Sequence, residues 1–240
     1  VFAGAVAKHV LKHRNITIAS HIKSIQDVCD ESFDSIDIDE ATVSRLRKSD
    51  FPVLDESAGQ KMKEQILAAK KEKDSVGGII ETIITNLQPG LGFPIFDGVE
   101  SRLAHALFSI PAVKGVEFGA GFNITKLRGS QANDEFILEG NKIVTSTNHN
   151  GGILGGITTG MPLVFRVAIK PTPSIGISQK TVDLQKKQDT TITVKGRHDP
   201  CIVPRAIPAV EAASAVVVLD LLLEREGEYG LSKEFKNGDR

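Results

Sequence analysis

One stretch of the second half of the sequence combines a rigid turn with groups that bind anions. It follows an alternating apolar segment and places two prolines among a cation and two hydroxyls, in the order Lys170, Pro171, Thr172, Pro173, Ser174. Proline fixes an extended backbone, and ammonium and hydroxyl groups are donors that can hold a phosphate. The competing interpretation is structural, because two prolines also end a strand where it leaves a sheet.

A second stretch, residues 195–201, places an arginine and an aspartate two residues apart. Arg197 can grip a carboxylate or phosphate through two hydrogen bonds, and Asp199 can act as a proton acceptor. A salt-bridged loop in which Asp199 caps the following helix would explain the same residues. Both interpretations stay open on the local sequence alone.

The third stretch, residues 147–160, contains five glycines between Gly151 and Gly160. Glycine lets backbone N–H groups turn toward a ligand and lets the ligand approach without a Cβ in the way. The segment lacks the Gly-Lys-Ser/Thr ending of a nucleotide-binding P-loop and the spacing of a dinucleotide fingerprint. A flexible loop is the alternative.

Composition narrows the possible functions. The 240 residues carry a formal net charge of -1, so no global field recruits nucleic acid or an anionic membrane. Cys29 and Cys201 form no Cys-x-x-Cys motif, which argues against a zinc site, any other metal site or a disulfide framework and favours a reducing, cytoplasmic location. The apolar stretch 206–223 contains Pro208, Glu211 and Asp220 and is therefore expected to be a buried helix rather than a membrane span.

The apolar spacing predicts the elements that position these stretches. Helical spacing indicates helices over 2–14, 56–73, 99–110 and 205–226, and alternation or β-branched runs indicate strands over 15–24, 79–87, 112–118, 163–169 and 190–194. Residues 27–55 are expected to form short helix and loop on the surface. The four histidines within patterned elements are expected to be plain surface or core residues: His9, His13, His21 and His105. Strands of mixed order with long buried helices predict a single α+β domain over 1–240.

Several of these stretches together resemble the chorismate synthase family. The strings NHNGGILGGITTG (148–160), KPTPSI (170–175) and GRHDPCIVPRA (196–206) are similar to that family's signature blocks in order and spacing. RGSQANDEF (128–136) and AHALFSIPAVKGVEFGAGF (104–122) are similar to its intervening segments. The resemblance covers the whole chain and implies a fold of long helices sandwiched between antiparallel β-sheets.

The resemblance also implies a reaction. Members of the family are lyases of aromatic amino acid biosynthesis by the shikimate pathway, and remove phosphate and a ring proton from 5-enolpyruvylshikimate 3-phosphate by an anti-1,4 elimination. They require reduced flavin mononucleotide (FMN) and assemble as homotetramers. The sequence leaves open how the flavin is reduced. The same protein could reduce it with NADPH (the NADP couple), or an external system could do so.

Carried over residue by residue, the resemblance implies a catalytic role for one residue and flavin contacts for nine. Asp199 matches an aspartate that assists removal of the ring proton. The implied flavin contacts are Gln131, Ala132, Gly155, Lys170, Pro171, Thr172, Pro173, Ser174 and Arg197. We therefore expect the three polar turns to converge in one pocket that excludes water.

The family's remaining signature blocks, which carry further substrate-binding and catalytic residues, lie before the first residue of this sequence. We therefore expect the 240-residue chain to be inactive by itself although it derives from a chorismate synthase. Two other classes are alternatives to the enzyme: a non-catalytic phosphate- or nucleotide-binding α+β module, and a folded interaction fragment that binds no ligand.

Overall fold

A five-stranded antiparallel sheet organises the chain. The computed structural model describes residues 1–36 and 38–238, with side chains up to Gly227. The strands run in the order β2-β1-β3-β9-β4, and every neighbouring pair is antiparallel. They are β1 (Thr17–Ile25), β2 (Val28–Cys29), β3 (Gly78–Thr85), β4 (Val113–Phe118) and β9 (Leu163–Ile169).

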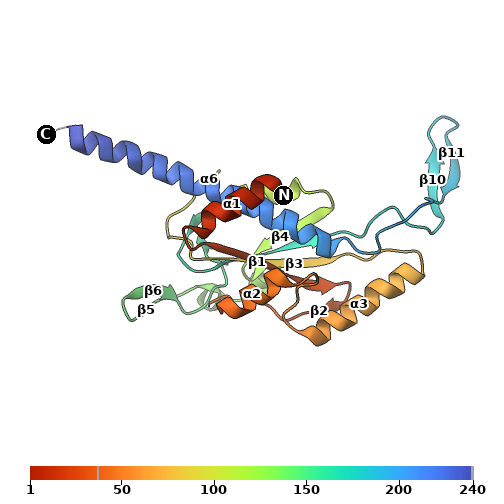
Figure 1. The fold of residues 1–240 in the computed structure, drawn as a ribbon, viewed down its shortest axis with the longest axis horizontal. Coiled ribbons are helices and arrows are strands. Elements are labelled where there is room, and N and C mark those ends of the chain that lie inside the picture. The colour runs from red at the N-terminus through yellow and green to blue at the C-terminus, as the bar shows by residue number, and fades with distance from the viewer. Residues whose placement is uncertain (37, 239–240) are drawn as a thin grey trace.

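The middle of this sheet is buried on both faces. In β9 alternate side chains fall on opposite faces, yet Leu163, Val164 and Phe165 are all buried. Helices cover both sides, as Figure 1 shows: α1 (Phe2–Lys12) and α6 (Val203–Gly238) lie above the sheet, and α2 (Glu40–Lys48) and α3 (Glu56–Lys71) lie below it. A further helix, α4 (Val99–Phe108), packs against α6 and β4. The α+β class is therefore confirmed.

The first part of helix α6 is apolar, and about half of it is buried inside the protein. Its segment Val203–Gly227 is long and apolar enough to cross a membrane, but it packs against β1, β3, α1 and α4. Val203, Val210 and Ala215 are fully buried in the main hydrophobic core. Apolar contacts inside the protein thus account for the apolar composition of the segment, which agrees with the expected buried helix.

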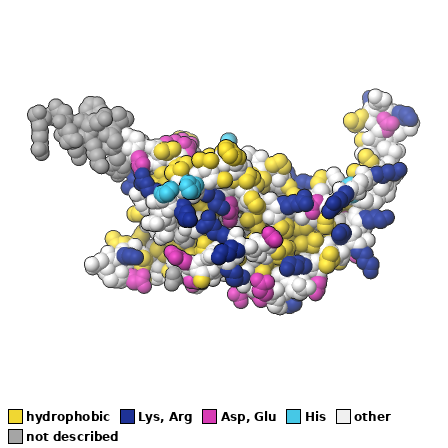
Figure 2. Space-filling view, in the orientation of Figure 1, with side chains coloured by type: hydrophobic (Ala, Val, Ile, Leu, Met, Phe, Trp, Pro, Cys, Tyr) yellow, Lys and Arg dark blue, Asp and Glu magenta, His cyan; other side chains and the backbone are white. Residues whose placement is uncertain are grey.

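The outer face of the helical layer stays exposed in this chain. Phe2, Val6 and Val10 of α1 share one helical stripe, and Phe2 is 86% exposed. Figure 2 shows hydrophobic side chains along this upper edge of the molecule. In the described residues, the helices α1, α4 and α6 contact the single five-stranded sheet.

Two hairpins reach away from opposite ends of the body (Figure 1). One is formed by β5 (Phe136–Glu139) and β6 (Lys142–Thr145), and the other by β10 (Gln179–Asp183) and β11 (Gln188–Ile192). Side chains on both faces of β5 and β11 are exposed. A strand with no buried face need not alternate in hydrophobicity, and for this reason the first hairpin and β10 escape prediction from the sequence.

Most predicted elements are confirmed within about two residues, the usual uncertainty of helix and strand boundaries. The strand expected at 190–194 is β11, two residues earlier at Gln188–Ile192. Two expectations are corrected. The helix expected at 205–226 begins at Val203 and extends to Gly238. The expected surface segment 27–55 contains buried residues, because Phe33, Val43 and Leu46 form a second hydrophobic cluster with the lower face of the sheet.

Candidate functional site

The turn after β9 is built by close backbone approach. The backbone N–H of Lys170 donates to Ala112 O at 2.9 Å, and the two prolines then carry the chain away from the sheet. Gly77, before β3, lies so close that a Cβ there would be 2.9 Å from Pro171 Cδ and would overlap Ile169 O. The sheet therefore fixes where Lys170 and Thr172 lie.

The segment 75–76 joins this turn to the Arg197–Asp199 stretch. Ser75 Oγ donates to Thr172 O at 2.6 Å, and Val76 N donates to Pro200 O at 2.8 Å. Two of the three predicted stretches therefore share one corner of the molecule, although about 25 residues separate them in the chain. We call Lys170–Ser174 with Arg197–Cys201 the proline corner.

Buried polar atoms without partners mark the proline corner. Among the described residues, the buried side-chain N and O atoms that make no hydrogen bond are Thr172 Oγ1 and Asp199 Oδ2. Arg205 Nη1 lies 3.0 Å from Asp199 Oδ2, but the angles are not those of a hydrogen bond, and the Arg205 side chain is 81% exposed. Since buried polar groups are almost always paired, these two atoms at two predicted site residues are available to a ligand or to an ordered water.

Other groups of the proline corner have distinct surroundings. Arg197 and Ser174 are exposed, whereas Cys201 is buried. Burial raises the pKa of the Cys201 thiol to about 11, so it is neutral at physiological pH and unsuited to nucleophilic attack. Asp199 lies four residues before Val203, where α6 begins, so it is too far from the helix to cap it. The salt bridge that the structural interpretation expects is present, because Asp199 pairs with Arg205.

The glycine-rich stretch lies at the other end of β9 and is firmly held. The side chain of Asn148 donates to Ser35 O at 2.7 Å and to Pro162 O at 2.8 Å, and accepts from Gly152 N at 2.6 Å. Gly151 packs backbone to backbone against Gly119 and has a φ of +65°. The alternative of a flexible loop is therefore not supported for residues 148–152.

Gly155 occupies the tip of a small hairpin formed by β7 (Ile153–Leu154) and β8 (Ile157–Thr158). It is exposed, has a φ of +60°, and no atom lies within 4 Å of the position a Cβ would take. Glycine is required here by the left-handed backbone, and the space beside it is open in this chain.

Gln131 and Ala132 belong to α5 (Gly129–Ala132), which follows a short 3-10 helix, η1 (Gly121–Lys126). Gln131 Oε1 accepts from Arg128 N at 3.0 Å and caps its own helix. The next turn is tied to the glycine-rich stretch by Asp134, whose carboxylate accepts from His149 N at 2.7 Å and Asn150 N at 2.9 Å.

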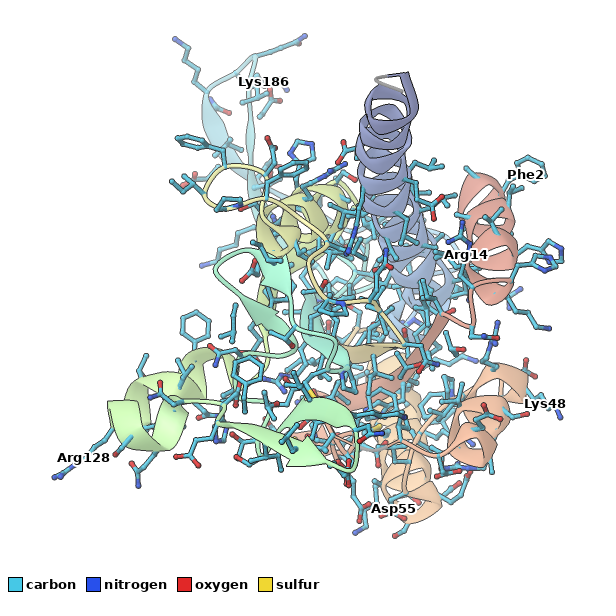
Figure 3. All side chains as sticks on the ribbon, turned by 90° about the vertical axis from the view of Figure 1, so that its left-hand side faces the viewer. Phe2, Arg14, Lys48, Asp55, Arg128 and Lys186 are labelled. Atoms are coloured by element: carbon cyan, nitrogen blue, oxygen red, sulfur yellow. The ribbon has the colours of Figure 1, made fainter. Side chains whose placement is uncertain are left out.

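Within the described residues of one chain, the three stretches do not meet in one pocket, so that expectation is wrong for the isolated chain. Val164, near the start of β9, contacts the glycine-rich stretch, whereas the proline corner begins at the opposite end of the strand. Seven residues of strand span roughly 20 Å. In Figure 3, Arg128, just before α5, and Lys186, between β10 and β11, lie on different projections of the molecule.

Sequence reasoning also missed residues that build these ends. Asp134 and Asn148 organise the glycine-rich end, and Ser75 joins the two halves of the proline corner. Arg166 lies beside a hollow of about 270 Å³ that Gly119 and His149 also line. Arg166 could have been noticed as the one charged residue in the apolar strand LVFRVAI.

Comparison with known proteins is consistent across sequence and structure. The family profile described as "Chorismate synthase" matches residues 1–223. A chorismate synthase of Thermococcus kodakarensis is 48% identical over 234 residues, which are 96% of this chain and 63% of that protein. One of Methanothermobacter thermautotrophicus is 44% identical over 230 residues, covering 93% of this chain and 59% of that protein.

A crystal structure of a chorismate synthase superposes with a TM-score of 0.75 at 31% identity and covers 93% of this chain and 62% of that one. The chain thus spans about three fifths of the length of the relatives it matches. The match of the profile to nearly the whole sequence shows that this chain belongs to the chorismate synthase family.

Proposed function

We propose that the protein containing these residues converts 5-enolpyruvylshikimate 3-phosphate into chorismate by anti-1,4 elimination of phosphate, and that it requires reduced FMN. The observation that carries the proposal is the pair of buried, unpaired atoms at the proline corner, Thr172 Oγ1 and Asp199 Oδ2. A non-catalytic binding module is not favoured, because the chain is similar to enzymes over nearly its whole length.

The residues of the proline corner fit an anionic flavin and an anionic substrate. Lys170 and Arg197 supply positive charge, and Thr172 and Ser174 supply hydroxyl donors to phosphate or ring oxygens. Gly77 and the prolines hold this turn against the sheet edge, so the donors need little rearrangement on binding. When bound, reduced FMN supplies an electron to the departing phosphate and recovers it.

Asp199 is proposed to hold the proton that leaves the substrate ring. One of its oxygens is buried, makes no hydrogen bond and contacts the exposed Arg205 guanidinium, so a proton acceptor is available without breaking a hydrogen bond. The Asp199 side chain is 27% exposed in this chain, and a bound flavin and substrate would cover it.

Gln131, Ala132 and Gly155 are proposed as flavin contacts from a second copy of the chain. They lie at the opposite end of β9 from the proline corner, on exposed surfaces beside a projecting hairpin. A homotetramer in which the glycine-rich end of one subunit faces the proline corner of another would reunite them. Exposed apolar residues of the β5–β6 hairpin, such as Phe136 and Leu138, suit burial between subunits.

The test is titration of reduced FMN, with and without 5-enolpyruvylshikimate 3-phosphate, against the chain and its Thr172→Val variant. Valine keeps the shape of threonine and removes the unpaired hydroxyl, so we expect FMN affinity to fall about tenfold without loss of stability. Thr181→Val, on the exposed strand β10, is the matched control and should bind as the parent does. Equal affinity of all three proteins would contradict the proposal.

A further inference from the structure

Four charged side chains form a continuous row across the sheet. His21 of β1 is the register partner of Glu81 of β3, Glu81 is the partner of Arg166 of β9, and Arg166 is the partner of Glu117 of β4. Their potential charges alternate in sign along the row. The row lies on the face of the sheet that α2 covers, together with Ala19 and Val164 of the second hydrophobic cluster.

The row is bonded from end to end. Arg166 Nε donates to Glu117 Oε1 at 2.5 Å, and Arg166 Nη1 donates to Glu81 Oε1 at 3.2 Å. The other oxygen of Glu81 lies 3.0 Å from His21 Nε2. The His21 and Glu81 side chains are 0% and 1% exposed, so water does not screen this contact.

The surroundings of His21 require a proton on each ring nitrogen. Nδ1 lies 2.9 Å from Asp30 Oδ2, and Nε2 lies 3.0 Å from Glu81 Oε2. Both carboxylate oxygens also accept backbone N–H groups, from Leu54 at 2.6 Å and from Phe33 at 2.8 Å. In a neutral ring, one nitrogen would carry a lone pair instead of a proton and would face a carboxylate oxygen without a hydrogen bond. That arrangement is unfavourable where no water is present.

The charge balance around the ring favours the same protonation state. Burial lowers the pKa of His21, but the hydrogen bonds to Asp30 and Glu81 and the negative charges of both outweigh burial and raise the pKa above 6.5. The other charged groups nearby are Lys23, which donates to the backbone O of Asp30, and Arg166, which reaches the ring only through Glu81.

The row connects two separate regions of the chain. On one side Asp30 accepts from Leu54 N and from Asp55 N, and Glu81 accepts from Phe33 N, so the excursion 30–55 is fastened to the sheet.

On the other side Arg166 Nη2 donates to Gly119 O at 2.6 Å. The next residue, Ala120, donates its N–H to His149 O at 2.7 Å. The hollow of about 270 Å³ lies between the two regions, lined by Phe33, Ser35, Gly119, His149 and Arg166 among others. The same row therefore sets both walls of this hollow.

We propose that this row is a proton-dependent clamp, in which a doubly protonated His21 closes the 30–55 excursion onto the sheet and, through Glu81 and Arg166, positions Gly119 and the glycine-rich stretch. His21 and Arg166 are positioning residues. Their influence on flavin binding rests on the proposed function, whereas the clamp itself does not.

The sign of the pH effect follows from the raised pKa. The stabilisation by His21 is complete below the unfolded-state pKa of about 6.5 and is lost as the pH rises through the folded-state pKa. The excursion should therefore loosen on the alkaline side, and acidification from neutral pH should leave this contact intact.

The first experiment is ¹⁵N NMR of the histidine ring nitrogens in the unmodified chain. We expect both nitrogens of His21 to carry protons at pH 7 and to lose one at a higher pH than an ordinary histidine does. A neutral tautomer at pH 7 would overturn the proposal, and this result needs no variant that has to fold.

The second experiment is amide hydrogen exchange between pH 6 and pH 9, without flavin, on the parent and on Glu81→Gln. The variant removes one negative charge beside His21 and keeps an acceptor for Phe33 N. In the parent, we expect the protection factors of residues 31–36 and 119–120 to fall at least tenfold as the pH rises. In Glu81→Gln, the same fall should occur at a lower pH. Glu139→Gln, in the exposed β5 strand, is the control and should follow the parent.

Amide protection that does not change with pH in the parent would contradict the proposed clamp. FMN titration of the same proteins gives a separate readout: affinity should fall with the loss of protection, at a lower pH in Glu81→Gln. If the protein containing this chain binds no FMN at any pH while the NMR and exchange results hold, the proposed function fails and the clamp stands.

Discussion

The two ends of β9 differ in how their polar groups are satisfied. At the glycine-rich end, the Asn148 amide and the Asp134 carboxylate are fully engaged in hydrogen bonds within the chain. At the proline corner, Thr172 Oγ1 and Asp199 Oδ2 are buried and make none. The polar groups of the first end are satisfied within the chain, whereas the second end keeps two buried oxygens that make no hydrogen bond.

This difference separates two kinds of requirement that look alike in a sequence. Polar residues at the glycine-rich end are needed to build a shape, so their loss should cost stability. Polar residues at the proline corner contribute little to folding and are available to a ligand, so their loss should cost binding or turnover. The predictions below test this division.

The largest expected effect is on turnover and comes from Asp199→Asn. If Asp199 holds the ring proton, chorismate formation by the protein containing this chain should fall by about 10² to 10⁴-fold. The free energy of unfolding should change little, because the carboxylate oxygen makes no hydrogen bond in the folded chain and its ion pair involves an Arg205 side chain that is 81% exposed. Asp189→Asn, on exposed β11, serves as control, and activity within twofold of the parent would remove Asp199 from the reaction.

Glycine substitutions should sharpen the contrast within the glycine-rich end. Gly119 and Gly155 have similar φ values of +54° and +60°. An added Cβ would overlap His149 O at Gly119, whereas it meets no atom within 4 Å at Gly155. In urea unfolding, Gly119→Ala should cost about 2–4 kcal/mol and Gly155→Ala only about 1–2 kcal/mol. Equal costs would show that overlap is irrelevant.

Loss of the Asn148 side chain should also destabilise the fold. Asn148→Ala leaves Ser35 O, Pro162 O and Gly152 N without their partner, which should cost about 2 kcal/mol in the free energy of unfolding. Asn141→Ala, in the exposed turn between β5 and β6, should stay within about 0.5 kcal/mol of the parent. A stable Asn148→Ala variant would argue against a prebuilt glycine-rich end.

The smallest effect is a pH dependence at Asp134. Burial raises the pKa of this carboxyl, but hydrogen bonds from Asn150, Thr147 and His149 outweigh burial and lower the pKa below 3.8. Its contribution to stability is therefore present above the unfolded-state pKa and lost as the pH falls through the folded-state pKa. Below about pH 4, the free energy of unfolding measured in urea should fall in the parent and should fall less steeply in Asp134→Asn. Identical pH slopes would contradict this assignment.

The sequence predicts β9 within its exact bounds because alternation and the following prolines are strong local signals. Residue types alone also mark both halves of the proline corner as candidate sites, with a structural alternative open for each, and their role stays a prediction. That the two halves meet depends on Ser75 and Val76, which carry no local sign of such a role.

Features that depend on strand register are the ones that escaped prediction. His21 was expected to be an ordinary core or surface residue, and it is indeed buried, but its bonding to Asp30 and Glu81 follows from strand pairing across 60 residues. Glu81 and Arg166 are each the one charged residue of an apolar strand. A single charged residue in an apolar strand can be noticed in the sequence, but the row that these residues form depends on strand pairing and cannot.

The central claim is that the proline corner is a ligand site, and a crystal structure of the protein with FMN and 5-enolpyruvylshikimate 3-phosphate tests it most directly. The account predicts that Thr172 Oγ1 and Asp199 Oδ2 each gain a hydrogen-bonding partner from flavin, substrate or an ordered water between them. Flavin bound elsewhere, with both atoms still unpaired, would contradict it.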